Sequence, residues 1–312
     1  VDMMGNTIHN WDMLERGYTM HHAISQDKQG NILATVSKTS AKIANGKDVR
    51  INDFIIRMDP EKGEILQEWD LVHMLDSARY GMTDYNLTAD PYAQNASNWA
   101  HNNGIVEWGN NYLATARYQG IFKFNKAGGI EWIISPHGYW RDRYLKLLLN
   151  PLHADGTPIT DPDVIAGTKN CDDFEWPWGC HTAVPLPNGH IFYFNNGYGR
   201  NFKLDFTDRK NVYTCGIEYE VDEVNRTVRQ VWQYGKERGT AYFTPARSGV
   251  QYLEQTGNRL ICPGMSNVLS NGNRGARVTE VDPETQEIVF ELELEDAIYQ
   301  RVYRMSLYPD NQ

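Results

Sequence analysis

A unit of four strand-like runs recurs along the chain. Each copy begins at a polar residue, continues through two apolar runs around a Gly or Asn turn, and ends with a hairpin whose turn is usually acidic. The four copies span residues 21–71, 101–134, 181–234 and 247–294. Short apolar runs bounded by Gly, Asn, Asp and Pro are typical of β-strands. Four such strands per repeat predict the blades of an all-β propeller.

The residues that open these units form a chemically unusual set. Three of them are histidines, His22, His101 and His181, and each stands eight residues before a glycine that starts a turn. The first strand of a propeller blade lies innermost, so residues that open the blades should converge at one end of the central channel. We call them the ring residues: His22, His101, His181, Arg247 and, in a fifth partial copy, Tyr303. His21 competes with His22 for the first position.

The chain does not contain a whole number of blades. It covers about four complete blades, and residues 5–13 resemble the last strand of an earlier one. We therefore expect residues 1–312 to be a propeller domain whose first blade or so lies upstream. The longest insertion, residues 135–178, comes just before His181 and is long enough to form a lid. Within it, apolar residues recur every three to four positions over 139–149, which predicts one short helix ending before Pro151.

Charge and hydrophobicity exclude several partners. The formal net charge is −10, and no basic run occurs that would bind nucleic acid. No apolar run approaches the roughly 18–20 residues that a membrane-spanning helix needs. We therefore expect neither nucleic acid nor membrane insertion.

The ring residues predict a pocket for a small anion. Asn103 lies two residues after His101, and Arg117 lies on the next strand, so the local charge is positive. Three histidines also suit Zn²⁺ or Cu²⁺, but an adjacent arginine opposes a cation, and we expect no metal cofactor. A neutral histidine can instead attack phosphorus or sulfur and form a covalent intermediate.

The four cysteines leave two alternatives open. Cys171, Cys180, Cys215 and Cys262 are either buried thiols or include a disulfide between Cys171 and Cys180. Such a bridge would close a loop directly before His181 and would imply an oxidising compartment. A zinc site is disfavoured because the chain has no CxxC pair.

Three segments carry a resemblance to a known family. Residues 98–134 (NWAHNNGIVEWGNNYLATARYQGIFKFNKAGGIEWII), 138–156 (GYWRDRYLKLLLNPLHADG) and 171–183 (CDDFEWPWGCHTA) resemble the bacterial arylsulfate sulfotransferases that are independent of nucleotide sulfate donors. The likeness extends over about residues 18–305. The family pattern of a first His, an H-x-N pair, an Arg on the next strand and an H-T-A nucleophile falls on His22, His101, Asn103, Arg117 and His181.

The resemblance implies most of the functional expectation. It implies a six-bladed propeller preceded by a β-sandwich domain, an exported periplasmic homodimer, no cofactor, and ping-pong transfer through sulfohistidine. The partners would be an aryl sulfate donor and a phenol acceptor. The sandwich is absent from these residues. Cys180 stands where the family usually has Gln, so a bridge from Cys171 would be shifted toward the nucleophile.

Roles follow for the individual residues. His181 attacks the sulfur, Arg117 and Asn103 bind the sulfonate, and His22 and His101 bind it and move the proton. Arg247 and Tyr303 join the substrate-binding set from the repeat alignment. Aromatic residues in or near the lid either stack on phenyl rings or only pack the lid; these are Tyr139, Trp176, Trp178 and Tyr198.

Two other functional classes remain as alternatives. A metal-dependent hydrolase or lyase propeller would use the histidines as ligands and would lose activity with chelators. A non-catalytic, ligand-binding propeller explains the blades and the acidic surface, but it does not predict a cationic ring at one depth of the channel.

Overall fold

The computed structural model describes residues 2, 4–45, 48–79, 99–204, 206–266 and 269–299, with side chains of 39–52 excepted. Tyr303 lies outside this part of the chain.

Within the described residues, 17 strands form four sheets. The first sheet contains β1 (Thr19–Gln26), β2 (Ile32–Asn45), β3 (Asp48–Met58) and β4 (Ile65–Asp70). The second contains β5 (Asn102–Trp108), β6 (Asn111–Ala116), β7 (Gly120–Phe124) and β8 (Ile130–Ile134). The third contains β10 (His181–Pro185), β11 (Ile191–Asn195), β12 (Cys215–Asp222), β13 (Thr227–Tyr234) and β9 (Asn150–Leu152). The fourth contains β14 (Ser248–Tyr252), β15 (Arg259–Pro263), β16 (Gly275–Val281) and β17 (Ile288–Glu295).

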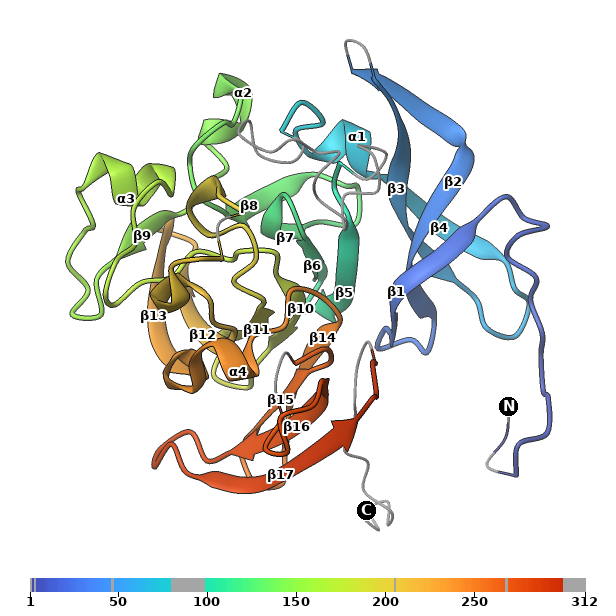
Figure 1. The fold of residues 1–312 in the computed structure, drawn as a ribbon. Helices are drawn as coiled ribbons and strands as arrows, with labels where there is room; N and C mark the ends of the chain where they lie inside the picture. Colours follow the sequence, from blue (N-terminus) through green and yellow to red (C-terminus); the bar gives the residue numbers. More distant parts are fainter. Residues whose placement is uncertain are drawn as a thin grey trace.

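Each predicted unit is one sheet. Its four strands pair antiparallel in sequence order, and only β9 joins the third sheet in parallel, at the outer edge of β13. The first strands of neighbouring sheets contact one another: β1 with β5, β5 with β10, and β10 with β14. Figure 1 shows the resulting propeller-like arrangement, from the first sheet in blue to the fourth in orange and red. The all-β, bladed architecture is confirmed for four sheets, and the number six stays a prediction.

The helix predicted over 139–149 is much shorter in the structure. Only α2 (Asp142–Leu145) forms there. The backbone of the following residues runs alongside β8 instead: Ile133 N–H donates to the Leu147 carbonyl at 2.8 Å, and Leu149 N–H donates to the Ile133 carbonyl at 3.0 Å. Leu148 and Leu149 are buried against the second sheet. Burying this apolar run against a sheet edge therefore wins over its helical periodicity.

The remaining helices are short. They are α1 (Leu71–Met74), α3 (Pro162–Ala166), α4 (Gly239–Tyr242) and three 3₁₀ turns at Arg200–Phe202, Arg209–Asn211 and Lys236–Arg238. Asp161 caps α3, accepting from Asp163 N–H, and Gly167 ends it in the left-handed conformation. None of the described helices is long and apolar enough to cross a membrane.

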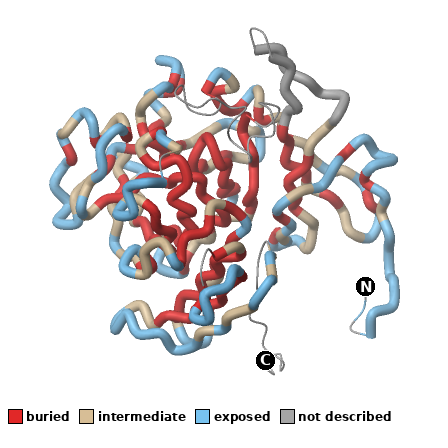
Figure 2. The backbone as a smooth tube through the Cα atoms, viewed as in Figure 1, coloured by how far each residue is buried: buried red, intermediate tan, exposed pale blue. Residues whose placement is uncertain are grey.

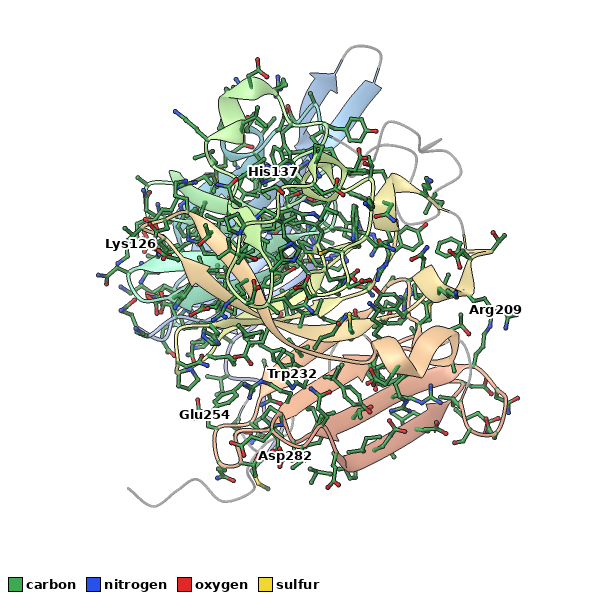
Figure 3. The ribbon with its side chains drawn as sticks, turned by 90° about the vertical axis from the view of Figure 1, so that its left-hand side faces the viewer. Lys126, His137, Arg209, Trp232, Glu254 and Asp282 are labelled. Carbon is green, nitrogen blue, oxygen red and sulfur yellow. The ribbon has the colours of Figure 1, made fainter. Side chains whose placement is uncertain are left out.

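Tryptophans link consecutive sheets in a repeated way. The last strand of one unit carries a tryptophan whose indole N–H donates to the outer turn of the next unit. Trp69 donates to the Lys126 carbonyl at 2.9 Å, Trp132 to Glu223 Oε1 at 2.8 Å, and Trp232 to the Pro283 carbonyl at 3.0 Å. In Figure 3, Trp232 lies beside the fourth sheet, whose outer turn is marked by Asp282. We call this contact the tryptophan latch.

A fourth latch involves the segment before β1. Residues 5–13 form no strand, contrary to their likeness to a last strand. Trp11 nevertheless donates to the Pro60 carbonyl in the outer turn of the first sheet at 2.9 Å. Its ring covers Gly63, where a Cβ would lie 2.5 Å from the indole and where φ is +64°. Trp11 therefore makes the contact that, in the other units, comes from a tryptophan of the last strand.

The core follows the sheets. Figure 2 shows the inner and middle strands of the second, third and fourth sheets buried, whereas the outer turns and most of β1 are exposed. The largest apolar cluster joins the second and third sheets to the insertion, and it includes Trp176, Trp178 and Cys180. The segment that leads into His181 is thus fixed between two blades, and this fixes where the candidate nucleophile begins its strand.

Candidate active site

The start of each inner strand has an irregular backbone. His22, His101 and Arg247 have φ values of 56°, 52° and 60°, and in the third sheet Thr182, next to His181, has φ 40°. The strand register shifts between Met20 and Ile24, between Asn102 and Gly104, and between His181 and Ala183. Such bulges re-aim a side chain at the end of a strand, and positive φ in non-glycine residues is found at functional sites. The predicted ring position is therefore a shared backbone feature.

The three ring histidines meet in one cluster. His22 Nε2 lies 3.0 Å from His101 Nε2, and the two ring centroids are 4.6 Å apart. The ring of His22 lies 6.2 Å from that of His181. His101 and His181 are buried, whereas His22 is open to solvent. His22, His101 and His181 lie 79 and 80 positions apart along the sequence. The bladed fold thus brings them together, as the repeat predicts.

Asn196 fixes the orientation of His181. The Asn196 Oδ1 lies 2.6 Å from His181 Nδ1, and the Gly179 carbonyl lies 3.2 Å from the same nitrogen. Asn196 Nδ2 donates to the Thr244 carbonyl at 2.8 Å, which sets the amide so that its oxygen faces the imidazole. Both partners of Nδ1 are acceptors, so Nδ1 carries the proton. The lone pair of His181 is therefore on Nε2.

The environment keeps the histidines neutral. Burial, followed by the positive charge of Arg117, lowers the pKa of His181 to about 3. His22 is exposed as a whole residue, but its ring lies among those of His21, His101 and His181. This desolvation of the ring, followed by the charges of His21 and His181, lowers the pKa of His22 to about 3. Burial, with His22 and Arg117 next in effect, sets the pKa of His101 well below 6.5. These three imidazoles are therefore neutral at neutral pH, and a neutral imidazole is the form that can act as a nucleophile.

Arg117 supplies the buried positive charge of the site. Its backbone N–H donates to the His101 carbonyl at 3.0 Å, and its Nη2 donates to the Pro245 carbonyl at 2.8 Å. The guanidinium lies 4.6 Å from the ring centroid of Tyr198. A guanidinium held in this way is a preorganised donor for an oxyanion.

Asn103 has a structural contact beside its predicted role. Its Nδ2 donates to the Cys180 carbonyl at 3.0 Å, and its Oδ1 accepts from Thr115 Oγ1 at 3.0 Å. The side chain therefore joins the second sheet to the residue before His181. Asn103 therefore contacts the backbone directly before the candidate nucleophile, His181.

His21 and His22 have different tasks. His22 contacts His101 and faces His181, so it is the ring residue. The Nδ1 atoms of His21 and His22 are 2.9 Å apart, and His21 Nε2 lies 3.5 Å from Asp53 Oδ1. Asp53 is buried and also accepts from Asn102 N–H at 3.0 Å. The imidazoles of His21 and His22 therefore lie between a buried carboxylate and the centre of the site, with His21 Nε2 near Asp53 but not hydrogen-bonded to it.

Some sequence expectations fall elsewhere. Arg247 has the ring backbone conformation, but its side chain is exposed, and within the described residues no contact links it to the histidines. Trp176 and Trp178 are buried in the core cluster and pack the insertion. Tyr198 stacks on Arg117, whereas Tyr139 is exposed.

Asn196, Ser248 and Asp53 were not anticipated from the sequence. Asn196 directly follows the second strand of its sheet, just as Arg117 does, so the repeat contained a signal for it. Asp53 and Ser248 are ordinary strand residues in sequence.

Of the two alternatives for the cysteines, the structure does not contain the disulfide between Cys171 and Cys180. All four cysteines are free thiols. Cys171 Sγ donates to Asp173 Oδ1 at 3.1 Å, while Cys180 is fully buried in the core cluster. Burial raises the pKa of the Cys180 thiol to about 12, so it is unreactive at neutral pH. The buried-thiol alternative describes Cys180, Cys215 and Cys262, and Cys171 is half-buried.

A comparison with known protein families shows to which family the chain belongs. The arylsulfotransferase (ASST) family model matches residues 1–304. The chain belongs to the arylsulfotransferase family. Two curated arylsulfotransferases named arylsulfate sulfotransferase AssT, from Escherichia coli O6:H1 and Lelliottia amnigena, are each 28% identical over the whole chain. The match covers 56% of each relative, so the chain spans little more than half of their length.

Solved structures resemble this chain only loosely. A putative 6-phosphogluconolactonase from Bacteroides uniformis is 13% identical, with a TM-score of 0.36 over 92% of this chain and 77% of that one. A europium-containing methanol dehydrogenase is 11% identical, with a TM-score of 0.32 over 89% and 49% of the two chains.

Proposed function

We propose that this protein transfers the sulfuryl group of an aryl sulfate ester to a phenol through a covalent intermediate on His181. The observation that carries the proposal is the bond from Nδ1 of His181 to Asn196, because it leaves the Nε2 lone pair beside Arg117 and two further imidazoles. The curated relatives are named arylsulfate sulfotransferases, which supports the transfer of a sulfuryl group from an aryl sulfate.

The first half-reaction uses the neutral imidazole. His181 Nε2 attacks sulfur, the N–S bond forms, and the S–O bond to the aryl group breaks. The phenolate leaves with that electron pair and takes a proton that His22 relays from solvent. Arg117, with His101 and Asn103, holds the sulfonate oxygens as charge redistributes toward the leaving oxygen. Preorganised donors of this kind each contribute roughly 2.7–4 kcal/mol to transition-state stabilisation in other enzymes.

The second half-reaction reverses the first with a new phenol. The phenol oxygen attacks sulfur, and the N–S bond breaks to restore the Nε2 lone pair. The phenolic proton passes to His22 and returns to solvent by way of His21 beside Asp53, which balances the proton taken up in the first half-reaction. Tyr198 and the exposed Tyr139 are aromatic surfaces for the two phenyl rings.

The metal-dependent alternative fits the geometry less well. Among the described residues, three ligand atoms of His, Cys, Asp or Glu lie within 4.8 Å of one another only at His153, Cys171 and Asp173. The three ring histidines do not offer such a set, and Arg117 lowers the pKa of His101 and His181, which reports positive potential in the pocket. A cation there would be repelled.

Assembly and location belong to the same proposal. We infer a periplasmic homodimer with a six-bladed propeller, because the family resemblance implies it. Residues 1–312 would be the propeller portion, with a β-sandwich domain preceding it.

The activity test uses para-nitrophenyl sulfate with and without added phenol. Sustained nitrophenol release that requires phenol is expected from the wild type and from His73→Gln, a change at an exposed histidine. His181→Gln should abolish release while keeping the fold. Release that continues without an acceptor would indicate a hydrolase, and loss of activity with a chelator would favour the metal-dependent alternative.

A further inference from the structure

A second group of reactive side chains lies in the insertion, apart from the ring residues. His153 stands in the turn after β9, and Cys171 and Asp173 stand on the segment that leads toward His181. His153 Nδ1 lies 3.0 Å from Asp173 Oδ1, and Cys171 Sγ lies 3.1 Å from the same oxygen. One ligand atom from each residue lies within 4.8 Å of the other two. We call these three residues the insertion cluster.

We propose that the insertion cluster binds a zinc-class transition-metal ion through His153 Nδ1, Cys171 Sγ and an oxygen of Asp173. Imidazole, thiolate and carboxylate are the ligand types of tetrahedral Zn²⁺. At usual Zn–N, Zn–O and Zn–S lengths, ligand atoms of a tetrahedron are about 3.4–3.7 Å apart. The two contacts to Asp173 Oδ1, at 3.0 Å and 3.1 Å, are within about half an ångström of that spacing. Water would complete the coordination.

The surroundings of the insertion cluster favour a cation. Asp173 Oδ2 accepts from Ala154 N–H at 2.9 Å, which holds the carboxylate toward the other two ligands. Asp155 adds negative charge nearby.

Nearby positive groups are already neutralised. Lys169 pairs with Asp161 at 2.7 Å, and Arg229 pairs with Glu220 at 2.5 Å. The side chains of His153 and Asp173 are 39% and 37% exposed, so an ion has a path from solvent. Binding would displace the thiol proton of Cys171 and require the tautomer of His153 that is protonated on Nε2.

A bound ion would tie two parts of the insertion together. The turn at residues 153–157 continues from β9, and Asp173 is followed by the buried residues Phe174 and Trp176 of the core cluster. The ion would therefore stabilise the segment before the candidate nucleophile. It lies outside the ring residues, so this inference does not depend on the proposed transfer reaction.

The test is a Co²⁺ titration of the reduced protein. We expect one equivalent to bind and to give the thiolate-to-cobalt charge-transfer absorption, which Zn²⁺ then displaces. Cys171→Ser should abolish this absorption, and His153→Ala and Asp173→Asn should each weaken binding by at least about tenfold. The matched control is His73→Ala, because His73 is paired with Asp70 at 3.6 Å but has no cysteine partner in that pair.

A second readout protects the test against misfolded variants. Zn²⁺ should raise the Tm of the wild type and of His73→Ala, but not that of Cys171→Ser, while the variants keep the wild-type circular dichroism. Absence of the charge-transfer absorption in reduced wild-type protein would overturn the proposal. Equal Co²⁺ affinity in wild type, Cys171→Ser and His153→Ala would overturn it as well.

Discussion

Asn196 Oδ1 lies 2.6 Å from His181 Nδ1, and this contact determines which nitrogen of the candidate nucleophile is free to react. The amide is itself fixed by the Thr244 carbonyl and by Ser248 Oγ at 3.0 Å. The third and fourth sheets thus cooperate in setting one tautomer, whereas the second sheet supplies Arg117.

The role of Asn196 can be tested by substitution. Asn196→Ala should lower kcat by roughly 100-fold or more with little change in KM, because part of the His181 population would take the wrong tautomer. Asn196→Asp should keep the tautomer but raise the pKa of His181 through its negative charge, so the acid limb of the pH profile should move up. A uniform rise in KM with unchanged kcat would argue against a positioning role.

The pH dependence of activity should differ from that of free imidazole. The pKa of His181 is lowered to about 3, so the nucleophile remains neutral well below the ordinary histidine value of 6.5. The rate of the sulfation half-reaction should therefore be level between about pH 5 and about pH 8. Stopped-flow release of nitrophenol measures it, and a fall in rate centred near pH 6.5 would contradict the lowered pKa.

Stability should have a related pH dependence. Above pH 6.5 His181 is neutral in both the folded and the unfolded chain. As the pH falls from 6.5 toward about 3, the unfolded chain takes up a proton that the folded protein excludes. The free energy of unfolding should thus decrease by up to about 1.4 kcal/mol per pH unit for this residue. Urea unfolding of wild type and His181→Gln between pH 4 and 7 should show a shallower slope for the variant.

The imidazoles of His21 and His22 predict a separate effect on acceptor turnover. His21→Ala and Asp53→Asn should slow the second half-reaction more than the first, because they remove the proton route from His22 while leaving Nε2 of His181 unchanged. Burst kinetics separate the two steps. Equal slowing of both steps would indicate that these residues only support the fold.

The tryptophan latch predicts how the blades share stability. Trp132→Phe keeps an aromatic ring but removes the hydrogen bond to Glu223, which should cost about 1.5–3 kcal/mol because the acceptor is charged. Trp232→Phe, whose acceptor is the Pro283 carbonyl, should cost about 0.5–1.5 kcal/mol. Denaturant unfolding ranks the two, and the reverse order would contradict this account.

The repeat explains how much of the molecule was predictable. Four sheets and the meeting of His22, His101 and His181 follow from residues that recur at one position, since each blade places that position alike. The helix over 139–149 failed because its leucines find a partner in β8, a contact distant in sequence. The sequence does not single out Asn196, because a neutral amide after a strand is common, although Asn196 occupies the repeat position of Arg117. Arg247 has the predicted backbone conformation, but it is exposed, and its place in the site stays a prediction.

The covalent intermediate tests the central proposal most directly. The protein, with any upstream portion, would be mixed with para-nitrophenyl sulfate in the absence of phenol, quenched and analysed by intact mass and peptide mapping. The account predicts one added SO₃ group per chain on the peptide containing His181, removed on addition of phenol and absent in His181→Gln. Phenol-dependent turnover without any adduct, or an adduct on another residue, would contradict it.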